Sequence, residues 1–93
     1  MMTPATIRSR VMARNSLGPL KDPAFRVIDA LQSVSDPSVQ LDALALTFAL
    51  VARGTGIDPH ELVSRANRQL LDADTVRNPA IEAIEAYAQG ELR

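Results

Sequence analysis

Cysteine and tryptophan are absent from this chain of 93 residues, and His60 is its only histidine. Without cysteine the chain can form neither a disulfide nor a thiolate site, which fits a reducing compartment and predicts a cytoplasmic protein. One histidine cannot supply the several nitrogen or sulfur ligands of a structural metal site. We therefore expect no metal and no cofactor.

Aromatic side chains and long apolar runs are also scarce. Phe25, Phe48 and Tyr87 are the only aromatic residues, fewer than a β-sandwich of this size would need. The longest apolar stretch is Ala43–Ala52, interrupted only by Thr47. It is far shorter than the roughly 20 residues of a membrane-spanning helix, so no membrane contact is expected.

Proline, by contrast, occurs at informative positions. Five prolines follow a residue suited to capping a helix, and proline loses nothing at a first helical position, where its missing N–H would have no partner. The pairs are Thr3-Pro4, Asp22-Pro23, Asp36-Pro37, Asp58-Pro59 and Asn78-Pro79. Apolar residues at helical spacing follow each pair, which predicts helices over about 4–15, 23–34, 37–53, from 59 onward and over 79–92.

These elements predict an all-α fold, a compact bundle of four to five short helices around a central apolar helix at about 37–53. Leu44 and Phe48 are expected to be its most buried residues, whereas Gln40 and Thr47 mark its least buried side. At the start of the next helix, Asp58 and Glu61 are spaced as a capping box. Glu61 is also four residues from Arg65, the spacing of a surface ion pair.

Charge divides the chain into a basic beginning and an acidic remainder. Residues 1–28 carry a net charge of +4, and residues 29–93 carry −5. We expect residues 1–20 to form a basic arm or helix, loosely ordered or ordered only by a partner, and residues 21–93 to form one α-helical domain. A solvated helix surface and an organellar transit peptide are alternative interpretations of the arm.

Catalytic chemistry is not indicated. His60 falls in the first turn of a predicted helix, where the helix dipole disfavours its protonated form. The carboxylate pairs have only the spacing of ordinary helix surfaces, and Gly54-Thr55-Gly56 is too short to cradle a phosphate. The sequence predicts a protein that is not an enzyme.

The junction between the third and fourth predicted helices, residues 49–66, resembles a helix-turn-helix. Val51-Ala52 is followed by Gly56 four residues after the alanine, then by Ile57 and Leu62. The resemblance implies nucleic-acid binding through Ser64, Arg65 and Arg68, although Arg65 stands where the pattern has an apolar residue. The acidic body opposes DNA binding, because phosphate neutralisation dominates DNA affinity.

A second resemblance is carried by Gly56-Ile57-Asp58-Pro59-His60-Glu61-Leu62 and by Ala86-Tyr87-Ala88-Gln89-Gly90-Glu91-Leu92. These segments are similar to small orphan α-helical proteins encoded by phages and prophages. The resemblance implies a protein that binds a host or virion component in the cytoplasm of a bacterial or phage-infected cell.

The leading functional prediction is a small non-enzymatic regulatory or inhibitory module that docks on a protein partner. The expected contacts are the basic Arg8, Arg10 and Arg14 and the acidic Glu82 and Glu85. Opposite charge at the two ends also permits a homodimer or another oligomer, steered electrostatically. The alternative prediction is a helix-turn-helix regulator that binds nucleic acid.

Overall fold

The computed structural model describes residues 2–14, 16–75 and 78–92, which form five α-helices and no strand. The helices are α1 (Pro4–Ala13), α2 (Gly18–Gln32), α3 (Pro37–Thr55), α4 (Pro59–Thr75) and α5 (Pro79–Glu91). The predicted all-α class is confirmed. None of the helices in the described part of the chain is long and apolar enough to cross a membrane.

Four of the five predicted helix starts are confirmed, with the side chain before each proline accepting a hydrogen bond from a free backbone N–H. Thr3 Oγ1 accepts from the N–H of Thr6 at 3.2 Å. The corresponding bonds are Asp36 to Ser38, Asp58 to His60 and Asn78 to Ala80, each at 2.9 Å. These caps satisfy donors that the first helical turn leaves without an intrahelical partner.

The fifth predicted start, at Asp22-Pro23, is wrong. Helix α2 begins at Gly18, Pro19 lies in its first turn, and Pro23 lies inside the helix. Pro19 already occupies the position where a missing N–H does no harm, and Pro23 removes only one further bond near the start of the helix. The predicted boundary between residues 20 and 21 falls inside the same helix.

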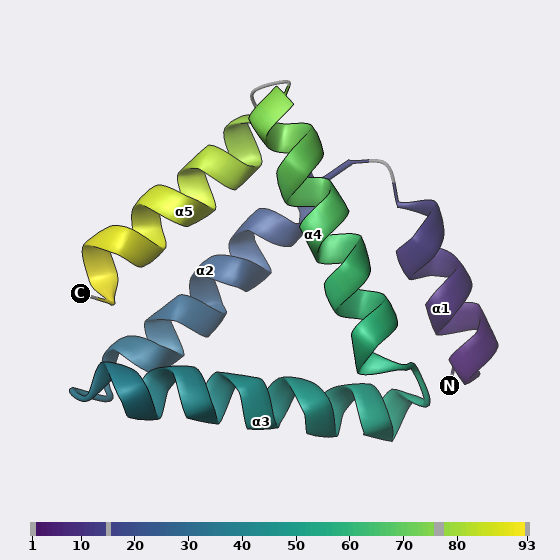
Figure 1. The fold of residues 1–93 in the computed structure, drawn as a ribbon, viewed down its shortest axis with the longest axis horizontal. Helices are drawn as coiled ribbons and strands as arrows, with labels where there is room; N and C mark the ends of the chain where they lie inside the picture. The colour runs from purple at the N-terminus through teal and green to yellow at the C-terminus, as the bar shows by residue number, and fades with distance from the viewer. Residues whose placement is uncertain (1, 15, 76–77, 93) are drawn as a thin grey trace.

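Helices α2 and α5 lie side by side and form the most extensive packing in the fold (Figure 1). The rings of Phe25 and Tyr87 meet there in a tilted arrangement, with centroids 4.6 Å apart. Ile28 of α2 is buried, and the Tyr87 hydroxyl donates a hydrogen bond to Asp29 Oδ1. Two of the three aromatic residues therefore stabilise this one helix pair.

Helix α3 is attached to its neighbours near its two ends. Near its start, the Gln40 amide Nε2 donates to the carbonyl oxygens of Leu31 and Val34, at 3.1 and 2.6 Å. At its end, Gly56 adopts a left-handed conformation with φ 76°, and the N–H of Ile57 bonds to the carbonyl of Ala52 at 3.0 Å. Seen in Figure 1, α3 is one side of a triangle completed by the α2–α5 pair and by α4.

The expected burial of α3 is wrong in detail. Leu44 is 39% exposed and Phe48 is only partly buried, whereas Gln40, expected on the least buried side, is only 7% exposed. The reason is that the neighbouring helices cover the ends of α3 and leave its middle open. Ala52, at 2% exposed, is its most buried residue, at the corner with α4.

Candidate interaction surfaces

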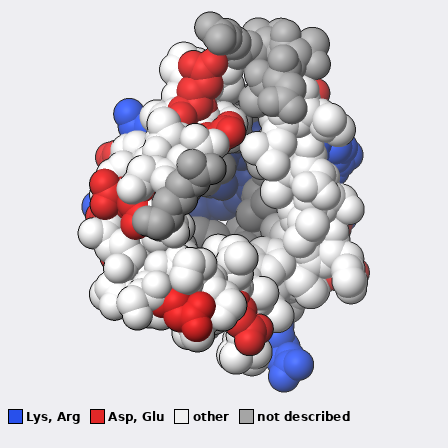
Figure 2. Space-filling model, turned by 60° about the vertical axis from the view of Figure 1, so that its left-hand side comes forward, with Lys and Arg blue, Asp and Glu red and all other residues white. Residues whose placement is uncertain are grey.

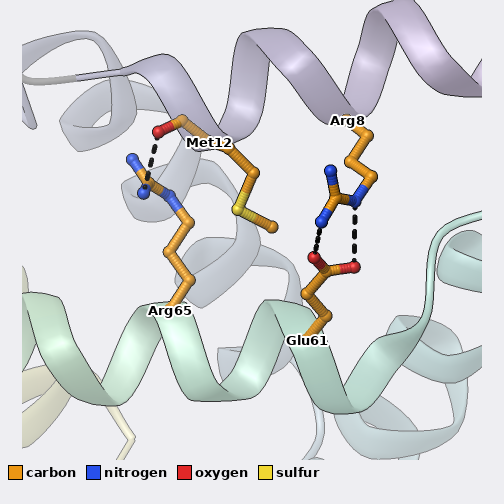
Figure 3. Close-up of polar contacts among 4 residues, drawn as sticks. All are labelled: Arg8, Met12, Glu61 and Arg65. Atoms are coloured by element: carbon orange, nitrogen blue, oxygen red, sulfur yellow. Dashed lines mark hydrogen bonds and ion pairs between the residues drawn. The ribbon is translucent and has the colours of Figure 1, made fainter.

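The basic helix α1 lies against α4 and is held there by two arginine contacts (Figure 3). In the first, the Arg8 guanidinium of α1 meets the Glu61 carboxylate of α4 with two bonds. Arg8 Nε donates to Glu61 Oε2 at 3.1 Å, and Arg8 Nη2 donates to Glu61 Oε1. The hydrogen bond and then the charge of Glu61 raise the pKa of Arg8 above its usual value.

The second contact runs in the opposite direction, from α4 to the end of α1. Arg65 Nη1 donates to the carbonyl oxygen of Met12 at 3.3 Å, and Nη2 donates to that of Arg14 at 2.6 Å. The last carbonyl groups of a helix have no intrahelical donor and carry partial negative charge. The cation of Arg65 therefore satisfies the C-terminal end of α1.

Both contacts alter the local pairing expected around Glu61. The Asp58 side chain caps α4 as predicted, but the Glu61 carboxylate that would complete the capping box bonds to Arg8. Arg65, expected to pair with Glu61, instead binds the backbone of α1. Partners from 51 to 53 residues away along the chain replace the local ones.

The remaining arginines of the arm have different surroundings. Arg10 is exposed and lies beside Ala5, Thr6, Ser9 and Ala13 at an open depression of about 370 Å³. Arg14 is the exposed C-cap residue of α1. Of the three arginines expected to bind a partner, Arg8 is therefore used within the chain, while Arg10 and Arg14 have exposed side chains.

The expected acidic contacts lie on α5, on the side of the molecule away from α1 (Figure 1). Glu82 and Glu85 are exposed, and Gln89 Nε2 donates to Glu85 Oε1 at 3.3 Å. Figure 2 shows acidic side chains in separate groups over one face of the molecule, with basic atoms visible inside a central hollow. The structure thus does not bring Glu82 and Glu85 together with the predicted arginines of the arm.

The residues expected for nucleic-acid binding lie on α4 in unlike environments. Ser64 and Arg68 are exposed, whereas Arg65 is partly buried against α1. His60 is exposed in the first turn of the same helix, as expected. Within the described residues, no group of three His, Asp or Glu side chains is arranged to hold a metal ion.

One surface feature that the sequence alone did not predict is the apolar exposure of α3. Its side chains from Leu41 to Val51 were expected to form the core, but five large ones are more than a third exposed. These are Leu41 at 70%, Leu44 at 39%, Leu46 at 62%, Leu50 at 51% and Val51 at 59%, with Val39 also nearly half exposed. The apolar residues on more than one side of the helix were the signal, because two neighbours touching its ends cannot cover every side.

Comparison with known proteins gives no relative for this chain. No protein-family model, no curated protein sequence and no solved structure matches it.

Proposed function

We propose that this protein is a small non-enzymatic interaction module that docks on a macromolecular partner through the exposed apolar side of α3. The observation that carries the proposal is the exposure of Leu46 and Leu50 in the middle of that helix. In a phage or prophage setting, the module targets a host or virion component, whether α3 binds that component itself or a second copy of this chain. The module then acts by regulating or inhibiting that component in the cytoplasm.

Solvation energetics support this use of α3. Apolar surface costs free energy in water, roughly 25 cal/mol for each Å², and fully burying one leucine side chain contributes about 1.5 to 3 kcal/mol. Contiguous apolar patches on a monomer commonly mark interaction sites. Burying Leu46, Leu50 and Val39 against a partner would remove this cost and supply the core of an interface.

Charge contributes a separate, weaker component of the proposed interaction. Arg10 in the last turn of α1 and Arg14 at its C-cap have exposed side chains, and Glu82 and Glu85 are exposed on α5. Exposed charges of this kind steer association and set its salt dependence more than they set affinity. Reversal of Arg10 and Arg14 to glutamate is expected to slow partner association at low salt.

Site-specific photo-crosslinking tests the proposal directly. A crosslinking amino acid at position 46 should join the protein to a macromolecule in producing cells, whether that partner is another protein or a second copy. The control carries the same group at position 68, an exposed site on α4. A yield at position 46 no higher than at position 68 would remove α3 as the contact surface.

A helix-turn-helix regulator is the second candidate, because the corner between α3 and α4 has the packing that such a unit needs. Ala52 and Ile57 are buried on either side of the left-handed Gly56. The engagement of Arg65 by α1 weighs against this candidate, since nucleic acid would have to displace α1 from it.

Duplex binding at low salt separates the two candidates. Nucleic-acid binding predicts an affinity that falls steeply with salt and is lowered by Arg65→Ala and Arg68→Ala. Absence of binding at about 50 mM salt, where phosphate contacts are strong, would eliminate the helix-turn-helix function.

A further inference from the structure

The outer side of α3 carries an apolar row edged by one charge of each sign. Val39, Leu46 and Leu50 are separated by seven and four residues, which places them on one side of the helix. Asp42 and Arg53 are eleven residues apart, about three helical turns, so they lie nearly in line along one edge of that row. Both charged side chains are exposed.

This row faces away from the rest of the molecule. Gln40 and Ala52, the two buried residues of α3, contact α2 and the α3–α4 corner respectively. In Figure 1, α2 and α4 both extend from the same side of α3, whose other side has no helix against it. The row is therefore open along its length.

We propose that the row is covered by α3 of a second copy of this chain, paired antiparallel about a two-fold axis near Thr47 and Phe48. This inference rests on the proposed function and names the partner at the same surface. In an isologous pair, each residue that contacts a second residue is contacted by it in return, so a patch must be complementary to itself. The charges and the leucines of α3 both meet that condition.

The two charges determine the orientation of the pair. With the axis between residues 47 and 48, Asp42 of each copy lies opposite Arg53 of the other, which gives two ion pairs related by symmetry. In a parallel pair the charged edges of the two copies would lie on opposite sides of the interface, so neither ion pair could form. Residues 43–52 contain no other charge that would oppose the antiparallel arrangement.

The same register matches the apolar side chains. Leu46 of one copy falls within one residue of the level of Leu50 of the other, an offset of about 1.5 Å along the helix. Ala43 and Ala49 flank these leucines and leave room for close helix packing. The dimer thus buries leucines that the single chain leaves more than half exposed.

Charge-reversal variants of the full chain test both the partner and the orientation. Sedimentation equilibrium should show a wild-type dimer, whose dissociation constant rises about tenfold or more in Asp42→Arg and in Arg53→Asp. An equimolar mixture of these two variants should recover dimers, because one copy then carries two positive sites and the other two negative sites. Asp72→Arg on the exposed surface of α4 is the matched control and should leave the dimer unchanged.

Three outcomes overturn the proposal, provided that circular dichroism shows each variant to be folded. The first is a wild-type chain that stays monomeric at concentrations on the order of 1 mM. The second is a dimer that persists unchanged in Leu46→Glu. The third is a dimer that is lost in Leu46→Glu but whose dissociation constant is the same in Asp42→Arg, in Arg53→Asp and in their mixture. A monomer that still crosslinks through position 46 to another macromolecule would refute self-pairing alone, whereas no crosslink and no dimer would refute the proposed function as well.

Discussion

The hydroxyl of Tyr87 in α5 donates a hydrogen bond to the carboxylate of Asp29 in α2, although 58 residues separate the two along the chain. The bond stabilises the neutral phenol, and the nearby negative charge disfavours its ionised form. Together with partial desolvation, these effects raise the pKa of Tyr87 to about 12. The contact thus joins the α2–α5 pair through a group whose protonation can be measured.

Absorbance titration of Tyr87 is expected to show this raised pKa, with Asp29→Asn returning it toward the usual value of about 10. The folded chain holds the phenol proton more tightly than the unfolded chain does. The stabilising contribution is therefore complete below about pH 10 and is lost as the pH rises toward about 12. Tyr87 is the only tyrosine, so the signal is unambiguous. A tyrosine titrating near pH 10 in the folded wild type would contradict the contact.

Truncating Ile28 and truncating Leu44 should lower the free energy of unfolding by different amounts, because Ile28 is buried and Leu44 is partly exposed. Ile28→Ala removes a buried side chain from the α2–α5 pair and is expected to lower the free energy of unfolding by roughly 2 to 5 kcal/mol. Leu44→Ala should lower it by about 1 kcal/mol or less, because its side chain already contacts water. Urea denaturation at a concentration where the protein is monomeric provides the measurement. Equal losses would mean that α3 is covered in the monomer.

Replacing each of two glycines at the end of α3 by alanine should change the stability of the protein in opposite directions. Gly54 is inside the helix and an added Cβ would meet nothing within 4 Å, so Gly54→Ala should stabilise by about 0.5 to 1 kcal/mol. Gly56 has φ 76°, and its added Cβ would approach the Pro4 ring at 3.1 Å. Gly56→Ala should therefore destabilise by about 1 to 2 kcal/mol. The unfolding temperatures of both variants show whether each substitution stabilises or destabilises the protein. A stabilised Gly56→Ala protein would contradict the left-handed conformation of Gly56.

The attachment of α1 should depend on Arg65. Helix α1 contains no buried residue, so its arginine contacts account for much of what holds it to α4. Arg65→Met is expected to increase amide hydrogen exchange in α1 several-fold while leaving the α2–α5 pair protected, because local opening does not require global unfolding. Arg68→Met is the control on the same helix. Unchanged exchange in α1 would show that Arg65 does not hold it.

Sequence reasoning succeeded where the determining interactions are local. The caps at Thr3, Asp36, Asp58 and Asn78 each bond to a residue two or three positions away, so the sequence alone contains the information. The same rule failed at Pro23 because α2 begins earlier, at Gly18, without a side-chain cap and with Pro19 in its first turn. Local patterns identify a preferred helix start but do not choose between two that overlap.

Burial and the candidate surfaces depend on tertiary geometry and were predicted less well. Gln40 has a polar side chain, yet it is buried because two carbonyl groups at the end of α2 accept its amide hydrogens. The pairing of Arg8 with Glu61 bridges 53 residues, and nothing in the local sequence specifies it. The apolar character of α3 was evident from the sequence. Its exposure was not, because exposure depends on where the other helices lie.

Because Arg65 binds α1, any ligand of Arg65 must compete with α1 for that side chain. Only four residues separate Ala13 from Gly18, so α1 remains tethered beside α4 even when it detaches. A tether of this length gives α1 an effective concentration on the order of millimolar at its own binding site. An anion or acidic segment can bind Arg65 only by displacing the carbonyl groups of Met12 and Arg14. Only a ligand of high affinity or high concentration therefore displaces α1.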